Sequence, residues 1–233
     1  MVEAGLKPED LDFIFITHMH SDHTVDLAHV LLTGWIAYRK KPVHVIGPRY
    51  TAEFVRRVLH AFKLDVQLRR LADRVGKEMM HIAVQEVGQD DIIEGDGWRA
   101  TAVEVDHGYV KPALGYKFEA DGSTVVISGD TAPSEQLIVA AQGTDVLVHE
   151  LMVASPDRCT KHGPASENLT VFQRRIADSH TCVHEVGTIA ERAGARQLVL
   201  SHLPPHPDEQ AVLATISKDY RGPVRLGYDL LVV

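Results

Sequence analysis

The chain has 233 residues, of which 45% are hydrophobic, and its formal net charge is -8 at pH 7. This length suffices for one substantial domain with a buried core, whereas the negative charge disfavours a protein that coats nucleic acid through its overall charge. No apolar run approaches the ~20 residues that span a bilayer, and the first ten residues lack the regions of a signal peptide, so we expect a soluble, cytoplasmic protein without a membrane partner.

The first half of the chain alternates short apolar runs with amphipathic segments. Residues 11–16 (LDFIFI) are apolar apart from Asp12, which is typical of a strand buried on both faces. Apolar residues then recur over residues 27–38 with the three-and-four spacing of a helix. A second strand is expected at residues 42–47 and a second helix at 48–64, whereas residues 65–90 are charged, without a clear period, and are expected to form a helical or irregular excursion.

The second half continues the alternation of strands and helices. Its expected helices are residues 134–142, 182–193 and 208–219. The first begins at a serine and ends just before Gly143, and the second ends at Gly194. A long loop is expected from about residue 154 to 180 and a strand pair at 224–233. The remaining expected strands are residues 98–105, 113–120, 123–128, 145–150 and 197–202. This alternation predicts an α/β sandwich, and no linker divides the chain, so we expect a single domain of residues 1–233.

The two cysteines, Cys159 and Cys182, are too few for a disulfide framework and form no CxxC pair. Thiols in a reducing compartment stay reduced. We therefore expect two ordinary thiols.

Metal-seeking side chains follow four of the expected strands, at the point where each strand ends. In an α/β sheet the carboxyl ends of adjacent strands converge on one crevice. His18 and His20 point the same way on extended backbone, whereas the following turn redirects Asp22 and His23 toward a second ion. Imidazole and carboxylate suit zinc, and also manganese or iron. The sequence thus offers candidate ligands for two ions, namely His18, His20, Asp22, His23, His107, Asp130 and His202.

Alternatives exist for single residues of this set. A strand-end histidine such as His107 often only makes a hydrogen bond, and Asp130 could merely close a turn. The compact stretch HMHSDH, residues 18–23, is different, because burying three imidazoles and a carboxylate is costly unless they coordinate something.

The stretch THMHSDH resembles the HxHxDH signature of the metallo-β-lactamase fold. The resemblance continues, in family order, through VDHGYVKPALGYKFE, ISGDTAPSEQL, DVLVHE and LVLSHL, over residues 11–203. It is greatest for the branch of ribonuclease Z and arylsulfatase-like phosphodiesterases. The resemblance implies a four-layer αββα sandwich with two zinc ions. By position, it implies that His18, His20 and His107 hold the first ion, that Asp22, His23 and His202 hold the second, and that Asp130 bridges them.

Three residues are expected to be catalytic, namely His180, Asp22 and Glu150. The stretch SHTCVHEVGTIAERAG resembles the family segment that carries a histidine before a helix, and His180 takes that place. The resemblance implies that His180 contacts the scissile group and helps the leaving group depart. Glu150 is a candidate for orienting His180, and equally for a strand-end hydrogen bond, and Asp106 is a second candidate for holding an imidazole. His184, one turn further on, is expected to be a surface residue.

Three departures from the family pattern bear on the substrate. Only sixteen residues precede Thr17, where the family carries several strands. We therefore expect either an N-terminally shortened sandwich or an incomplete reading frame. In a shortened sandwich, we expect the partner chain of a homodimer to cover the exposed edge of the sheet. The 22 residues between His107 and Asp130 are too few for the tRNA-gripping arm of ribonuclease Z. Directly after His202 this chain has LPPHP, where ribonuclease Z tends to carry a basic and aromatic pair.

The leading hypothesis is a dinuclear zinc hydrolase that attacks a phosphodiester with a metal-bridging hydroxide, in the manner of ribonuclease Z. The alternative is an arylsulfatase or another small-ester or lactam hydrolase, and the second alternative is a truncated, non-catalytic metal-binding subunit. RNA could bind the basic segment, residues 49–77, which has eight basic and three acidic residues, although a solvated helix surface explains it more often. Trp35, Tyr38 and Tyr109 could hold a base, but core packing explains the first two better.

Overall fold

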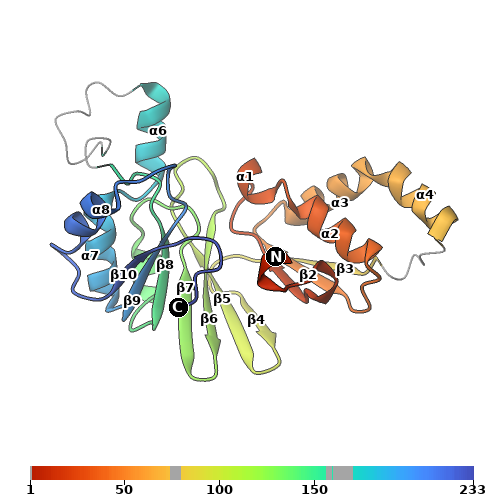
Figure 1. The fold of residues 1–233 in the computed structure, drawn as a ribbon, viewed down its shortest axis with the longest axis horizontal. Helices are drawn as coiled ribbons and strands as arrows, with labels where there is room; N and C mark the ends of the chain where they lie inside the picture. The colour runs from red at the N-terminus through yellow and green to blue at the C-terminus, as the bar shows by residue number, and fades with distance from the viewer. Residues whose placement is uncertain (1, 74–79, 156–158, 160–169) are drawn as a thin grey trace. The chain divides into compact units, whose positions relative to one another are not determined.

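The computed structural model describes residues 2–73, 80–155, 159 and 170–233, and the chain divides into two compact units, Met1–Val87 and Gly88–Val233 (Figure 1). Each unit has its own sheet and its own hydrophobic core. The single domain expected over both units stays a prediction. No helix among the described residues is long and apolar enough to cross a membrane.

The first unit is built on a three-stranded parallel sheet in the order β1-β2-β3. Its core lies between the sheet and the helices, where the apolar stripe of α2 meets Val43 and Val45 of β2. Trp35 is buried, as expected, but Tyr38 is 54% exposed, so core packing does not explain Tyr38. The elements of this unit are β1 (Phe13–Phe15), α1 (Ser21–Thr24), α2 (Leu27–Ile36), β2 (Val43–Gly47), α3 (Thr51–Ala61), α4 (Lys63–Asp73) and β3 (Ile82–Glu86), after short 3-10 turns at Val2–Ala4 and Pro8–Asp10.

The sequence predicted a helical or irregular excursion over residues 65–90. Residues up to Asp73 are helical, but residues 82–86 form a strand, so this part of the prediction was wrong. After α4, β3 completes the sheet, although only two of its five residues, Ile82 and Val84, are even partly buried. Its last residue, Glu86, accepts hydrogen bonds from the backbone N–H groups of Tyr50 and Ala52, both at 3.0 Å. A carboxylate at these orphan donors stabilises the start of α3. The sequence did not predict this strand because only two of its residues, Ile82 and Val84, are large and apolar.

The second unit is built on a seven-stranded sheet in the order β10-β9-β8-β7-β6-β5-β4. Strands β4 to β7 form an antiparallel meander, and β7, β8, β9 and β10 are parallel. Helices occupy the crossovers between the parallel strands, as such connections require. The elements are β4 (Ile92–Gly95), β5 (Trp98–Glu104), β6 (Leu114–Ala120), β7 (Ser123–Ile127), α5 (Glu135–Ala140), β8 (Val146–Glu150), α6 (Val171–Ser179), α7 (Val183–Ala193), β9 (Gln197–Ser201), α8 (Glu209–Ile216) and β10 (Val224–Leu226).

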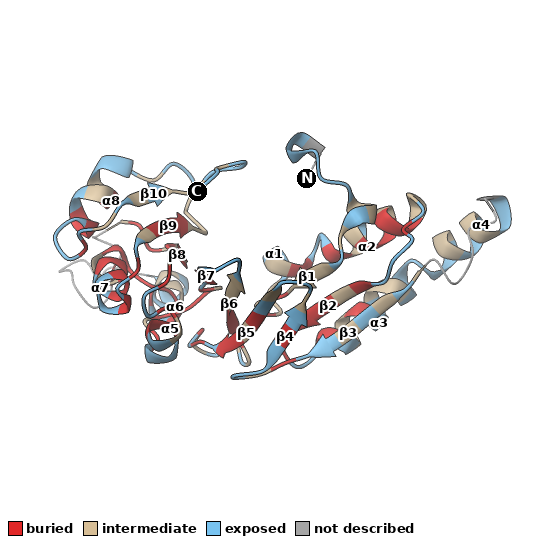
Figure 2. Ribbon diagram, turned by 90° about the horizontal axis from the view of Figure 1, so that it is seen from below, coloured by how far each residue is buried: buried red, intermediate tan, exposed pale blue. Residues whose placement is uncertain are grey.

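The core of the second unit lies between one face of this sheet and the helices α5, α7 and α8. Leu147, Leu198 and Leu200 on the strands pack with Val186 and Ile216 on the helices, and all five are buried. Figure 2 shows buried residues, in red, along β5 and β9 and in α7. The helix ends follow the expected signals. The Ser134 hydroxyl accepts from Leu137 N–H, and Gly194 ends α7 at a φ of 58°.

Two further expectations for this unit were wrong. The described end of the expected loop, residues 170–179, holds α6, whose start is fixed by a capping box between Thr170 and Gln173. The expected C-terminal strand pair is the single strand β10, followed by a turn. Both segments are short, and neither shows a sustained apolar period.

The expectation of two reduced thiols was also wrong. Cys159 and Cys182 form a disulfide with a Cα–Cα distance of 5.8 Å, which lies in the usual range. Both are buried beside Val153 and Ala177. The pairing escaped detection because it depends on the path of the chain between residues 23 apart.

We expect this disulfide to stabilise the fold, because it restricts the unfolded chain. Reduction should lower the free energy of unfolding by about 2–4 kcal/mol. Urea denaturation with and without a dithiol measures this difference. The double variant Cys159→Ala, Cys182→Ala should not respond to the reductant, and equal stability of the oxidised and reduced wild type would contradict the expectation.

Candidate metal centre

Polar side chains of the second unit collect at one edge of its sheet. β5 and β7 are both antiparallel to β6 and so run the same way, and β8 and β9 are parallel to β7. All four strands therefore end at the same edge. His107, Asp130 and His202 follow three of these ends, and Glu150 is the last residue of β8.

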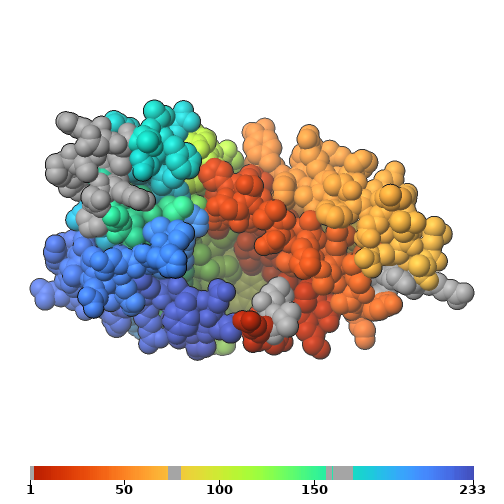
Figure 3. Space-filling view, turned by 45° about the horizontal axis from the view of Figure 1, so that its top comes forward, coloured from red at the N-terminus to blue at the C-terminus, as the bar shows by residue number. Residues whose placement is uncertain are grey.

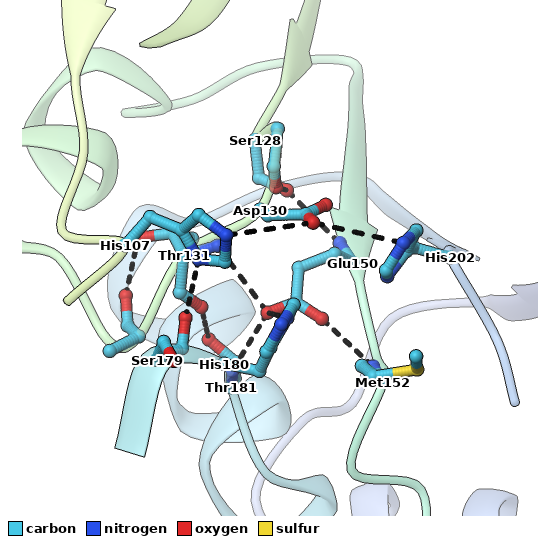
Figure 4. A network of polar contacts seen from close by, with 12 residues as sticks. His107, Ser128, Asp130, Thr131, Glu150, Met152, Ser179, His180, Thr181 and His202 are labelled. Atoms are coloured by element: carbon cyan, nitrogen blue, oxygen red, sulfur yellow. Dashed lines mark hydrogen bonds and ion pairs between the residues drawn. The ribbon is translucent and has the colours of Figure 1, made fainter. Parts of the chain in front are cut away.

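Asp130 is the central residue of this cluster. Its carboxylate oxygen Oδ2 lies 3.9 Å from His107 Nε2 and 3.7 Å from His202 Nε2 (Figure 4). Asp130, His180 and His202 also each offer a ligand atom within 4.8 Å of the others. Two donors that coordinate one zinc at ~2.0–2.2 Å stand roughly 3–4 Å apart. Both the spacing and the imidazole-carboxylate donor set therefore fit a zinc-type ion.

His107 is oriented by the backbone of α6. Its Nδ1 lies 2.9 Å from the carbonyl oxygen of Ser179, which fixes the tautomer with the proton on Nδ1. Nε2 is then the nitrogen that can coordinate a metal. Asp106, expected as a candidate for this task, instead accepts a hydrogen bond from Gly108 N–H at 3.2 Å. A backbone carbonyl carries no signature in a sequence, so the contribution of Ser179 could not be anticipated.

His180 stands at the end of α6 with its Nδ1 3.2 Å from Glu150 Oε1. The Glu150 carboxylate is buried and also accepts from the backbone N–H groups of Thr181 and Met152, each at 2.8 Å. Thr131 N–H lies 3.4 Å from the same Oε1. Glu150 thus ties together the segments that carry Asp130 and His180, as Figure 4 shows.

The rings of His180 and His202 are stacked, with centroids 5.7 Å apart. His202 has a φ of 50°, a left-handed conformation that is uncommon outside glycine. Such strain persists where the surrounding structure imposes it, and it concentrates at functional sites. This conformation places the imidazole of His202 at the sheet edge directly after β9.

The first unit holds a second group of imidazoles. The ring of His18 lies 4.8 Å from that of His20 and 4.2 Å from that of His23, between centroids. His20 is the N-cap of α1, and Asp22 and His23 lie in the helix, with His23 Nε2 3.5 Å from Asp22 Oδ2. Thr24 secures the turn by donating to the His20 carbonyl oxygen at 2.9 Å. Four predicted ligands therefore lie in one short segment.

His149 is a buried histidine that sequence reasoning passed over. It shares a sheet face with Leu147 and Leu151, and no described residue hydrogen-bonds its Nε2, whereas Nδ1 lies 2.8 Å from the Glu150 carbonyl oxygen. Burial lowers the pKa of His149 below its ordinary value of 6.5. Its imidazole is therefore held neutral.

We expect His149 to make the fold less stable in acid. Above pH 6.5 the imidazole is neutral in both states, but below this pH the unfolded chain binds a proton that the folded chain does not bind, so stability falls by up to ~1.4 kcal/mol per pH unit. Urea denaturation at pH 7.5 and 5.5 should show a smaller acid loss in His149→Leu than in the wild type. The exposed His60→Leu serves as the control, and equal acid losses in all three proteins would refute the expectation.

The basic segment offers less free charge than its composition indicates. Arg56 and Arg57 both pair with Glu53, and these hydrogen bonds lower the pKa of Glu53 to about 2. Arg69 pairs with Asp65 at 3.0 Å. Arg74 and Lys77 lie outside the described residues. The described helices thus favour a solvated, internally paired surface, and RNA binding there stays a prediction.

Comparison with known proteins gives consistent matches over nearly the whole chain. The family model described as "Beta-lactamase superfamily domain" matches residues 2–203. A ribonuclease Z of Mycobacterium bovis (strain BCG) is 33% identical over 97% of this chain and 80% of its own length. Among solved structures, human tRNase Z, short form, has a TM-score of 0.68 at 20% identity, over 100% of this chain and 82% of its own. The metallo-beta-lactamase fold protein YhfI from Bacillus subtilis has a TM-score of 0.67 at 17% identity, over 97% and 78%.

Proposed function

This chain belongs to the beta-lactamase superfamily and, within it, to the ribonuclease Z group, and on that premise we propose that it cleaves phosphodiester bonds in RNA at a centre of two zinc ions. As a member of this group it is a metal-dependent hydrolase. The proposed ligands are the residues that the family resemblance implies, and the cluster around Asp130 supplies four of the residues that the proposal uses, namely His107, Asp130, His180 and His202.

In this assignment His18, His20 and His107 would hold the first ion, and Asp22, His23 and His202 would hold the second. The separation of Asp130 from His107 and His202, at 3.9 and 3.7 Å, supports its role as the bridging carboxylate. Ser179 supports the role of His107, because its carbonyl holds the ring in the tautomer that a metal requires.

Two bound ions would lower the pKa of a shared water and stabilise the negative charge that grows on the phosphoryl oxygens. The chain's own contribution is proton transfer and orientation. His180, with Nδ1 at Glu150, presents Nε2 to a bound substrate and in its protonated form donates a proton to the departing oxygen. Glu150 holds the imidazole and stabilises its charged form, so it is a positioning residue.

The His180–Glu150 pair beside Asp130 is the observation that carries this proposal, because a site that only stores metal needs no buried, oriented proton donor. A panel of bis-p-nitrophenyl phosphate, p-nitrophenyl sulfate, nitrocefin and a 3'-extended precursor tRNA tests it with the metal-loaded chain. Hydrolysis of the phosphodiesters is expected. Turnover of the sulfate alone would overturn the proposal, and two bound metals without turnover would favour a non-catalytic metal-binding subunit.

One observation favours a second candidate, a hydrolase of aryl sulfates or other small esters. The segment between His107 and Asp130 is occupied by the hairpin of β6 and β7, which are joined by a two-residue turn. No long arm for gripping tRNA extends from this hairpin. The same substrate panel separates the two candidates.

The role of Glu150 gives a further prediction. Glu150→Gln keeps an oxygen that can accept from Thr181 N–H but loses the charge that favours protonated His180, so we expect roughly 10- to 100-fold slower turnover with metal content unchanged. The acidic pH dependence of kcat for the chain should also change. The exposed Glu135→Gln should behave as wild type in both measurements. A variant with normal kcat and an unchanged pH profile would remove Glu150 from the mechanism.

A further inference from the structure

Two segments of the second unit bring exposed aromatic and cationic side chains to the neighbourhood of His180. One is the loop between β5 and β6, which follows His107 and carries Tyr109 and Lys111. The other is α6, which ends directly before His180 and carries Phe172 and Arg175. The exposed fractions of Tyr109 and Phe172 are 75% and 72%, and both cations are exposed. Figure 3 shows α6, in cyan, on the molecular surface.

The loop and the helix touch at their bases. Gly108 adopts a φ of 60°, and a Cβ added to it would lie 3.2 Å from the Cβ of Ser179. His107 Nδ1 lies 2.9 Å from the Ser179 carbonyl oxygen, and the rings of His107 and His180 are 4.9 Å apart between centroids. The backbone that carries Tyr109 therefore starts against the end of α6 that precedes His180.

One face of α6 leads away from this contact. Phe172, Arg175 and Ser179 are spaced three and four residues apart, so they lie on the same side of the helix. At 1.5 Å per residue, Phe172 stands roughly 10 Å along the axis from Ser179. The capping box of Thr170 and Gln173 fixes the first turn, so Phe172 is held on ordered helix.

The chemistry of these side chains fits one class of ligand. Within the described part of the chain, none of the four side chains has an ion pair or ring contact. The nearest acids in sequence are Asp106, which accepts from Gly108 N–H, and Asp178. Aromatic faces that stack on bases, interleaved with cations that contact phosphates, are typical of surfaces that bind single-stranded nucleic acid.

We propose that Tyr109, Lys111, Phe172 and Arg175 form a rim that binds single-stranded RNA beside His180. Tyr109 and Phe172 stack on unpaired bases, and Lys111 and Arg175 contact the phosphates between them. This rim deepens the proposed function, on which it rests, and it gives the chain a means of holding RNA that does not depend on a long arm.

Fluorescence anisotropy of a labelled 12-nucleotide RNA, measured on the metal-free chain, tests the rim apart from catalysis. Tyr109→Ala and Phe172→Ala should each weaken binding by roughly 5- to 150-fold, whereas Tyr109→Phe and Phe172→Tyr keep the stacking face and the affinity. Lys111→Gln and Arg175→Gln should each reduce the salt dependence of binding by about one ion. Phe62→Ala and Arg57→Gln, in the basic segment, are the matched controls.

The outcomes separate this inference from the proposed function. Unchanged affinity in the rim variants, or losses confined to the basic-segment controls, would overturn the rim, even if the wild type cleaves RNA. A wild type that cleaves no phosphodiester would overturn the proposed function, even if the rim variants bind RNA more weakly. Circular dichroism of each variant establishes whether it is folded. If an alanine variant does not fold, the glutamine variants Lys111→Gln and Arg175→Gln still test the rim.

Discussion

Replacing Asp130 with alanine should remove metal and activity together. Asp130 is buried beside His107 and His202, and in the assignment it is the only side chain that would bridge both ions. Loss of a residue that only supports a metal ligand already lowers metal affinity or activity by 10- to 100-fold, so loss of Asp130 itself should lower phosphodiester turnover by at least ~100-fold. The metal content by plasma mass spectrometry and the rate on bis-p-nitrophenyl phosphate measure the two effects.

The isosteric Asp130→Asn separates charge from shape, since it fills the same space but cannot bridge two cations as a carboxylate does. Asp121→Asn, in the turn between β6 and β7, is the matched control, because its φ of 50° is one that asparagine tolerates. The control should keep both metal and rate. An Asp130→Asn protein with full metal content and full activity would show that Asp130 is only a structural residue.

Replacing His180 with alanine should leave the metal bound but slow turnover by ~10²–10⁴-fold, the usual contribution of a general acid. The expectation rests on the contact with Glu150, because a carboxylate beside Nδ1 stabilises the charged imidazole that donates a proton. The defect should be smaller with a substrate whose leaving group needs no proton, such as p-nitrophenolate. Metal content, and kcat on nitrophenyl and RNA substrates, are the measurements.

His184→Ala provides the control, since His184 lies one helical turn beyond His180 in α7 and takes no part in the assignment. It should retain both metal and rate. The proximity of His180 to Asp130 and His202 also permits coordination, so the metal analysis decides between the two roles. Loss of an ion in His180→Ala would make His180 a ligand and refute its assignment as proton donor.

The sequence predicted the parts of the fold that follow from local pattern. Buried parallel strands such as β8 and β9 are continuous apolar runs, and the polar residue after each run marks the edge where the site forms. The α/β class and the metallo-β-lactamase fold are confirmed on this basis. The sequence offered Glu150 as one candidate for orienting His180, and the two side chains are in contact, with His180 Nδ1 3.2 Å from Glu150 Oε1.

What could not be predicted depends on contacts distant in sequence. β3 is exposed at three of its five residues, so its place in the sheet comes from pairing with β2 rather than from its own pattern. The disulfide joins residues 23 apart, and the hydrogen bond between His107 and the Ser179 carbonyl joins residues 72 apart. Neither a backbone carbonyl nor a contact between segments distant in sequence leaves a pattern in the local sequence. These contacts, which support the site, therefore could not be predicted.

Titration of zinc into the metal-stripped chain, followed by calorimetry, tests most directly whether the proposed ligands bind two ions. The account predicts two ions per chain in the wild type and about one in each of two variants, His20→Ala in the first unit and His107→Ala in the second. Binding of two ions by both variants, or of none by the wild type, would contradict it.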